Sequence, residues 1–303
     1  MRVDNINMLN DTMAIMDRGY YEVNGKRVNL KLSEKERKEI FVFLPKDVKR
    51  IADNKDFQHV HVMGRIGVGC VNMDSYSLAI KRYSDCSYMF SKKSKPILVL
   101  NLANPVNPGG GVRRGSKAQE EDLCRKSSLL LSLESLEASV YYKYNKSLNT
   151  YMGSDAVMIT PQVEIIKDEN GDLLDESVIV SVMTCAAPML RDGMEGLTDQ
   201  EYRDTGMLKV AAHLGYEVLI LGAFGCGAFS NDAHVVSDLF YKALKEFDYD
   251  GMKAKDFFRR IDFAVLSRSA DQYNYKEFAT KCNYDENNCE ILKDPFKILR
   301  PND

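Results

Sequence analysis

The residues of this sequence with the clearest capacity for chemistry lie close together near its middle. A run of consecutive glycines ends at Gly111, a seven-residue spacer follows (Val112–Ala118), and then come Gln119, Glu120 and Glu121. Glycine lets backbone N–H groups approach an anion closely, and a helix N-terminus adds a favourable dipole. Two adjacent carboxylates would repel a phosphate. They therefore indicate a neighbouring sugar, where a carboxyl group binds hydroxyls or donates a proton to a leaving oxygen.

The elements that must position these residues are a strand before the glycines and a helix after them. The apolar run Ile97–Leu102 predicts a buried strand, and helical spacing predicts a helix over 118–137. Two familiar phosphate motifs are excluded in this stretch. Gly115-Ser116-Lys117 has the Ser and Lys of a P-loop in the wrong order, and there is no G-x-G-x-x-G fingerprint.

A second glycine-rich loop ends the apolar run that begins at Leu219. Glycines at 222, 225 and 227 open its backbone, and Phe229 closes it. By itself this pattern is an ordinary strand-to-helix turn. Loops at the carboxyl ends of parallel strands converge on one crevice, so the two loops together predict a site that grips a diphosphate from both sides.

The remainder of the chain predicts an α/β fold with a mixed, mainly parallel sheet covered on both faces, because short apolar runs alternate with helical patterns. Asn170-Gly171 signals a hairpin or loop. The expected strands are 68–72, 97–102, 156–160, 178–183, 217–222 and 262–266, and the expected helices are 74–83, 118–137, 199–214 and 232–247.

Residues 1–59 are expected to form a helical extension packed on this core. A first helix stops at Gly19, and Ser33 with Glu36 forms the capping box of a second helix that ends at Pro45. Residues 60–267 are expected to form the core and 268–303 a C-terminal tail, all within one structural domain.

Composition restricts the classes of partner. The 303 residues carry a net charge of −3, which predicts no general binding to nucleic acid or to an anionic membrane. An apolar signal region and a long apolar segment are both missing, so no membrane association is expected. The seven cysteines lack paired spacing, which favours free thiols and a cytoplasmic location.

The order of three glycines, a short spacer and Gln-Glu-Glu resembles the catalytic signature of poly(ADP-ribose) glycohydrolases, most closely the compact microbial type that is built on a macrodomain. The run 99–104, which reads V-x-N-x-A-N, is similar to the first ligand-binding loop of macrodomains. Gly-Tyr-Tyr at 19–21 and Gly-Ala-Phe-Gly-Cys-Gly-Ala-Phe at 222–229 also resemble segments of the microbial family.

This resemblance implies a three-layer α/β/α macrodomain-like fold and assigns roles to particular residues. In the family the second Glu is the general acid/base and the first fixes ribose hydroxyls, which gives these parts to Glu121 and Glu120. The backbone of 225–228 is expected to donate to phosphate, and Phe229 to press on the terminal ribose. No cofactor and no metal is expected. The residues predicted to bind substrate are Asp74, Asn104, Gly109, Gly110, Gly111, Gln119, Gly225, Cys226, Gly227, Ala228 and Phe229.

Several of these residues have a second interpretation. Asn104 binds the distal ribose or is a routine turn residue before a proline, and Asp74 holds the adenine amine or caps a helix. Cys226 has no base near it in sequence, so we read it as a small residue and not as a nucleophile. Tyrosines 141, 142 and 144 stack on adenine or line the sheet edge. The four histidines are scattered without metal-ligand spacing.

The predicted function is hydrolysis of the ribose–ribose O-glycosidic bond of poly(ADP-ribose) on modified proteins, with release of ADP-ribose. A basic track for a long polyanion is missing near either loop, which predicts cleavage from the chain end. Two alternatives stay open: removal of single ADP-ribose units from protein or nucleic acid, and a non-catalytic macrodomain that binds ADP-ribose or a related nucleotide. Intact Gln119-Glu120-Glu121 favours an enzyme.

Overall fold

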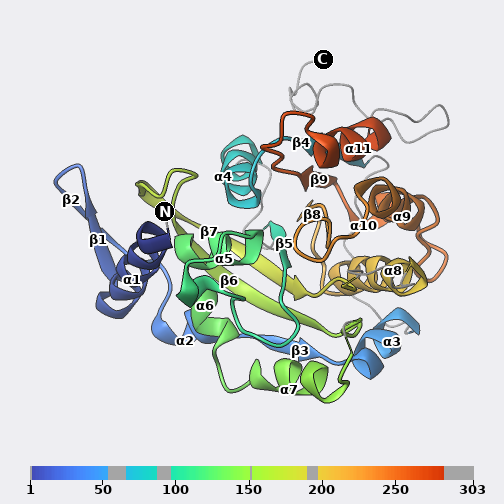
Figure 1. The fold of residues 1–303 in the computed structure, drawn as a ribbon, viewed down its shortest axis with the longest axis horizontal. Coiled ribbons are helices and arrows are strands. Elements are labelled where there is room, and N and C mark those ends of the chain that lie inside the picture. Colours follow the sequence, from blue (N-terminus) through green and yellow to red (C-terminus); the bar gives the residue numbers. More distant parts are fainter. Residues whose placement is uncertain (1, 54–65, 87–96, 151, 190–196, 283–303) are drawn as a thin grey trace.

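The computed structural model describes residues 2–53, 66–86, 97–150, 152–189 and 197–282. Its centre is a sheet with the strand order β3-β6-β7-β5-β8-β9-β4 (Figure 1). The pairs β7-β5, β5-β8, β8-β9 and β9-β4 are parallel, whereas the pairs β3-β6 and β6-β7 are antiparallel. The predicted mixed, mainly parallel sheet is therefore confirmed. The strands are β3 (Phe41–Phe43), β4 (Gly67–Val71), β5 (Leu98–Leu102), β6 (Val157–Lys167), β7 (Leu173–Cys185), β8 (Val218–Leu221) and β9 (Arg260–Ala264).

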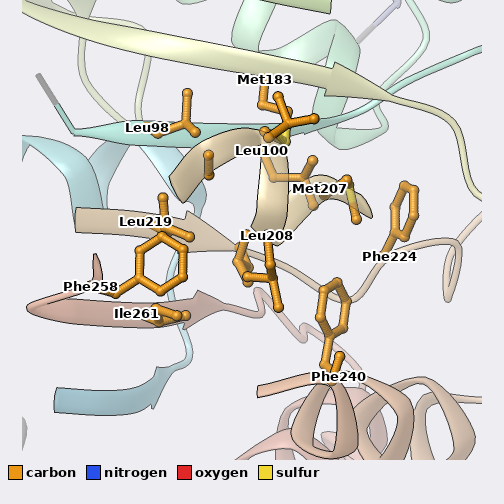
Figure 2. Packing of buried hydrophobic residues seen from close by; sticks show 14 of the residues in the cluster. Leu98, Leu100, Met183, Met207, Leu208, Leu219, Phe224, Phe240, Phe258 and Ile261 are labelled. Carbon is orange, nitrogen blue, oxygen red and sulfur yellow. The ribbon is translucent and has the colours of Figure 1, made fainter. Parts of the chain in front are cut away.

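Helices cover both faces of this sheet. Along β5, Leu98 and Leu100 enter one hydrophobic cluster and Val99 enters the other, as the alternation of strand side chains requires. Figure 2 shows the first cluster, where Leu98 and Leu100 pack near Leu208. That face is covered by α3 (Pro45–Asp53), α8 (Leu197–His213), α9 (Ala233–Lys245), α10 (Ala254–Phe257) and α11 (Tyr273–Cys282). The opposite face is covered by α1 (Arg2–Arg18), α4 (Ser75–Cys86), α5 (Gln119–Lys126), α6 (Leu129–Leu133) and α7 (Ser139–Ser147).

The N-terminal segment is less helical than expected. It contains the hairpin β1 (Tyr20–Val23) and β2 (Lys26–Asn29), and the capping box at Ser33 starts only the short α2 (Glu34–Lys38). The second helix does not reach Pro45. Glu39 is extended, and β3 then pairs Phe41 with Ile159 of β6. Aromatic and β-branched residues at 41–43 fit a half-buried strand better than a helix.

Buried charges attach this segment to β6. Glu164 is fully buried, and its carboxylate accepts the N–H groups of Lys31 at 2.7 Å and Leu32 at 3.2 Å. Lys167 reaches α1, where its ammonium bonds to Asp11. A buried carboxylate or ammonium is costly unless it is paired, so these contacts select one docking position for the segment.

The helix expected over 118–137 is broken into α5 and α6. Ser127 is extended and forms a bridge with Ile165, and Ser128 exchanges two hydrogen bonds with Glu164, one through its N–H and one through its hydroxyl. Strand β6 thus supplies the backbone partners that a continuous helix would have used.

The hairpin signalled by Asn170-Gly171 is confirmed, since Lys167 of β6 pairs with Leu173 of β7 and Gly171 adopts φ +90°. The expected C-terminal tail contains a core helix, because Phe278 of α11 is buried beside Phe263. None of the helices in the described ranges combines the length and apolar character needed to cross a bilayer.

Candidate functional site

A cleft of about 680 Å³ opens at the carboxyl ends of the parallel strands. Its walls include the segments that follow five of these strands. They begin at Met73 after β4, Leu102 at the end of β5, Ala187 after β7, Ala223 after β8 and Ala264 at the end of β9. The two glycine loops were predicted to meet at one cleft. The second loop, around Gly225 and Gly227, lines the cleft directly, whereas the consecutive glycines 109–111 do not.

Glu120 and Glu121 lie on the first turn of α5 and both line the cleft. Glu120 is 2% exposed, and its two oxygens accept the N–H of Asn104 at 2.8 Å and the amide of Asn101 at 3.4 Å. Glu121 is 7% exposed and accepts the N–H of Gly111 at 2.8 Å through Oε1. Its Oε2 is buried without a hydrogen-bond partner among the described residues. Of the two carboxylates, Glu121 therefore keeps an oxygen for a ligand.

Burial changes the ionisation of Glu120. It raises the pKa of Glu120 from 4.5 to about 8, and the neighbouring Glu121 raises this pKa further, while the N–H of Asn104 lowers it. Two carboxylates that share one site ionise together only at high cost. At neutral pH the pair thus carries less than its full negative charge, which permits an anionic ligand nearby.

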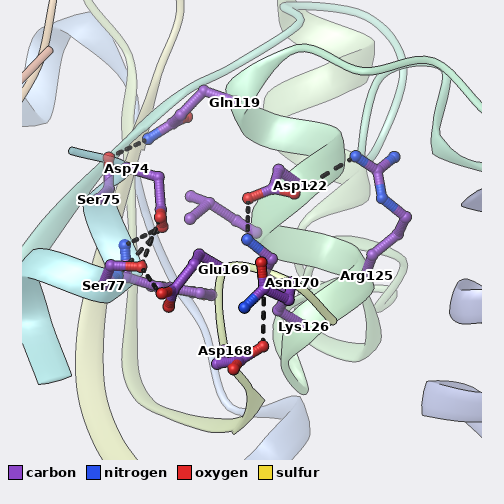
Figure 3. A network of polar contacts seen from close by, with 12 residues as sticks. Asp74, Ser75, Ser77, Gln119, Asp122, Arg125, Lys126, Asp168, Glu169 and Asn170 are labelled. Carbon is purple, nitrogen blue, oxygen red and sulfur yellow. Dashed lines mark hydrogen bonds and ion pairs between the residues drawn. The ribbon is translucent and has the colours of Figure 1, made fainter. Parts of the chain in front are cut away.

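Gln119 attaches the start of α5 to the end of β5. Its Oε1 accepts the N–H of Leu102 at 2.9 Å, and its Nε2 donates to the carbonyl of Leu100 at 2.7 Å and to Ser75 Oγ at 3.1 Å (Figure 3). Both ends of the amide are thus engaged by the protein. The geometry supports a positioning role for Gln119, where the sequence predicted a substrate contact.

The three consecutive glycines pack against the carboxylates and lie outside the cleft wall. A Cβ at Gly110 would lie 2.6 Å from Glu121 Oε1 and 3.0 Å from Glu120 Oε2, and a Cβ at Gly109 would lie 2.7 Å from Leu130 Cδ1. Gly109 and Gly110 have φ of +63° and +59°. Glycine is required here because the backbone approaches two acidic side chains, and not because it approaches a phosphate.

In the second loop, Gly225, Gly227, Ala228 and Phe229 line the cleft. Within the described residues, the N–H groups of Gly225 and Gly227 have no protein acceptor. Gly225 adopts φ +77°, and a Cβ there would lie 2.0 Å from Asn231 Nδ2. These two N–H groups are therefore available to a ligand, and their donation to phosphate stays a prediction.

Cys226 is the exception in this loop. Its N–H donates to Ala223 O at 3.1 Å, its side chain packs against the core, and it is not part of the cleft wall. Burial raises the pKa of its thiol to about 12, so the thiol is neutral at physiological pH. This placement does not support the predicted substrate contact of Cys226. The neutral thiol agrees with the interpretation that Cys226 is not a nucleophile.

Asp74 and Asn104 line the cleft, but each also serves its own loop. Asp74 accepts the N–H groups of Tyr76 and Ser77, both at 3.1 Å, and so caps α4 (Figure 3). Asn104 Oδ1 accepts the N–H groups of Val106 and Asn107, both at 2.9 Å. The structure thus shows Asp74 as a helix cap and Asn104 as a turn residue. Any ligand contact must use the atoms that remain.

Other candidates lie away from the cleft. Tyr141 and Tyr142 are buried in an edge-to-face pair, which excludes them from its wall. His213 contacts Tyr249 and His234 pairs with Glu277, while histidines 59 and 61 lie outside the described residues. In the described part of the chain, no group of three or more His, Cys, Asp or Glu side chains is placed to hold a metal ion.

Several cleft residues that lie far from the carboxylates in sequence were not predicted as site residues. Asn5 and Met8 of α1 and Glu169 and Asn170 of the β6–β7 turn all line it, and Figure 3 shows the turn beside α4 and α5. No local pattern could indicate them, because their distance from the carboxylates along the chain is closed only by folding. Asn101 had a signal, since it is a polar residue inside an apolar strand.

These features define a macrodomain-like α/β protein whose cleft presents two adjacent carboxylates and a glycine loop in which the N–H groups of Gly225 and Gly227 have no acceptor among the described residues. Residues 10–168, just over half of the chain, match the family profile described as the catalytic domain of the microbial-type PARG, that is, poly(ADP-ribose) glycohydrolase. The chain belongs to this family.

Solved structures of bacterial enzymes share the fold. Poly(ADP-ribose) glycohydrolase from Thermomonospora curvata superposes with a TM-score of 0.80 at 23% identity, over 92% of this chain and 99% of that one. The same enzyme bound to the inhibitor ADP-HPD gives 0.77 at 23% identity and the same coverage. The Deinococcus radiodurans enzyme in complex with ADP-ribose gives 0.70 at 28% identity, over 84% and 98% of the two chains. No curated protein sequence matches this chain.

Proposed function

We propose that this protein hydrolyses the ribose–ribose O-glycosidic bond of poly(ADP-ribose) and releases ADP-ribose. The observation that carries the proposal is the carboxylate pair at the start of α5. There Glu121 has a buried oxygen without a partner among the described residues, and it shares a cleft with the loop 225–229. Family membership and the ADP-ribose bound to the Deinococcus radiodurans enzyme, which is 28% identical, support it.

In the proposed reaction Glu121 acts first as acid and then as base. Its Oε2 donates a proton to the departing glycosidic oxygen while positive charge develops on the ribose ring. The resulting carboxylate is held at Oε1 by the N–H of Gly111 and takes a proton from the attacking water. The anomeric carbon thus loses a bond to the leaving ribose and gains a bond to hydroxyl.

Glu120 fixes the ribose, and the loop 225–229 holds the diphosphate. Glu120 is buried and fastened at both oxygens, so it offers a fixed oriented group and little freedom for proton transfer. Gly225 and Gly227 supply N–H groups, and Phe229 supplies an apolar wall beside the ribose. The consecutive glycines 109–111 support the carboxylates. No metal takes part in this scheme.

We also propose that the substrate is polymer attached to modified proteins and that the enzyme acts in the cytoplasm. The described cysteines 70, 124, 185, 226 and 282 are free thiols, which supports a reducing compartment.

The test is a time course on end-labelled poly(ADP-ribose), run in parallel with mono-ADP-ribosylated protein. We expect chain-end cleavage, with ADP-ribose as the early product and few free oligomers. Early oligomers would contradict chain-end cleavage, and turnover of the mono-modified protein alone would favour the alternative hydrolase. Binding of ADP-ribose without turnover of either substrate would show that the protein is a non-catalytic ADP-ribose-binding module.

Gly110→Ala should sharply reduce turnover, because the new methyl would displace both carboxylates. A displacement of this kind costs about 10²-fold in rate. Gly25→Ala is the matched control: Gly25 has φ +72° and no atom within 4 Å of an added Cβ, so it shares the backbone strain without touching the site. Turnover of both variants is measured at matched folded fraction. Equal losses in the two variants would refute the proposed support role of Gly110.

A further inference from the structure

We infer that Asn5 of α1 is a positioning residue for Glu121, acting through the loop that connects the glycines to α5. This inference rests on the proposed function of Glu121. Residues 1–59 were predicted to form an extension outside the catalytic core, and α1 has no assigned part in the reaction. In the structure α1 lies beside α5 (Figure 1). Asn5 and Met8 of α1 line the cleft.

The contact of Asn5 with the loop is a single directed hydrogen bond. Asn5 Nδ2 donates to the carbonyl of Gly115 at 3.0 Å. Gly115 has φ +75°, and a Cβ there would lie 2.7 Å from the carbonyl oxygen of Arg2. The backbone of α1 is therefore packed directly on this glycine, and only glycine permits the approach.

From this contact a short path of hydrogen bonds leads to the carboxylate. Ser116, the residue after Gly115, donates its N–H to Gly111 O at 3.2 Å, and the N–H of Gly111 in turn donates to Glu121 Oε1 at 2.8 Å. A shift of the loop at Gly115 thus moves the donor that holds Glu121.

Helix α1 also holds the far end of α5. Thr12 Oγ1 donates to the carbonyl of Arg125 at 2.5 Å, and Arg125 Nη1 donates to the carbonyl of Ser116 at 2.5 Å. Thr12 and Arg125 are both buried. The helix that carries the carboxylates and the loop that orients them are thus both fastened to α1, and Asn5 is a contact of α1 that also lines the cleft.

The experiment compares substitutions at two asparagines of α1. Asn5→Asp keeps the side-chain volume but turns a second oxygen toward the Gly115 carbonyl, and Asn5→Ala removes the donor. Asn10 is exposed on the same helix, so Asn10→Asp and Asn10→Ala are matched controls for charge and helix propensity. We expect kcat on poly(ADP-ribose) to fall roughly three- to tenfold in Asn5→Ala, the size of one lost hydrogen bond, and further in Asn5→Asp.

A positioning role leaves ligand binding nearly unchanged, so the dissociation constant for ADP-ribose should match that of the Asn10 variants. The melting temperature should fall by only the few degrees that one lost hydrogen bond costs. A readout independent of turnover is hydrogen–deuterium exchange of the 111–116 amides, which should accelerate in Asn5→Asp and not in Asn10→Asp. If the 111–116 amides exchange faster in Asn5→Asp but the wild-type protein does not turn over poly(ADP-ribose), the contact of Asn5 with the loop is supported and the proposed function is refuted. Wild-type kcat and exchange in Asn5→Asp, or a loss confined to ADP-ribose affinity, would overturn the inference.

Discussion

Replacing Glu121 by Gln should abolish turnover of poly(ADP-ribose) while leaving ADP-ribose binding intact. Losing a general acid/base costs about 10²- to 10⁴-fold in rate. Glutamine is nearly isosteric, and its oxygen can still accept the N–H of Gly111 at the position where Glu121 Oε1 now accepts it. The other terminal atom falls where Oε2 has no partner within the described residues, so the substitution breaks no visible contact.

Three measurements separate this expectation from trivial loss of activity. Turnover is followed on labelled polymer, ADP-ribose binding by calorimetry, and folding by thermal unfolding. Glu137→Gln is the control, because Glu137 is an exposed carboxylate outside the cleft wall. Turnover of Glu121→Gln close to that of Glu137→Gln would refute the assignment of the acid. Loss of ADP-ribose binding would instead make Glu121 a binding residue.

Glu120→Gln should make the protein more stable, and increasingly so as the pH rises. Burial raises the pKa of Glu120 from 4.5 to about 8. Between these values the folded chain holds a proton that the unfolded chain has released. The free energy of unfolding therefore falls as pH rises through this window, by about 1.4 kcal/mol per pH unit from this group alone.

Glutamine imitates the protonated carboxyl group and removes this dependence. The melting temperatures of wild type and Glu120→Gln should nearly coincide at about pH 4.5 and diverge towards pH 8, by roughly 2–4 °C per pH unit. Glu137→Gln again serves as control and should follow the wild type. A constant difference across this range would show that Glu120 ionises normally in the fold.

Features that depend on neighbouring residues were accessible from sequence. Glu120 and Glu121 lie on the first turn of a helix after a glycine loop, as the spacing predicted, and the Asn170-Gly171 turn joins β6 to β7. Alternation of apolar runs with helical patterns predicted the mainly parallel sheet. Each of these signals depends on backbone preference or on residues a few positions apart.

Three results depended on tertiary structure. Residues 41–43 form strand β3 because β6 pairs with them. Helix α5, which contains Glu121, ends before Ser127 because the backbone of Ser127 pairs with β6. The consecutive glycines face carboxylates, where the sequence predicted a ligand. A glycine pattern shows that space is needed beside the backbone, but only the packed chain decides which atoms fill it. For the same reason Asn5, more than a hundred residues before Glu121, reaches the cleft through contacts that no local pattern encodes.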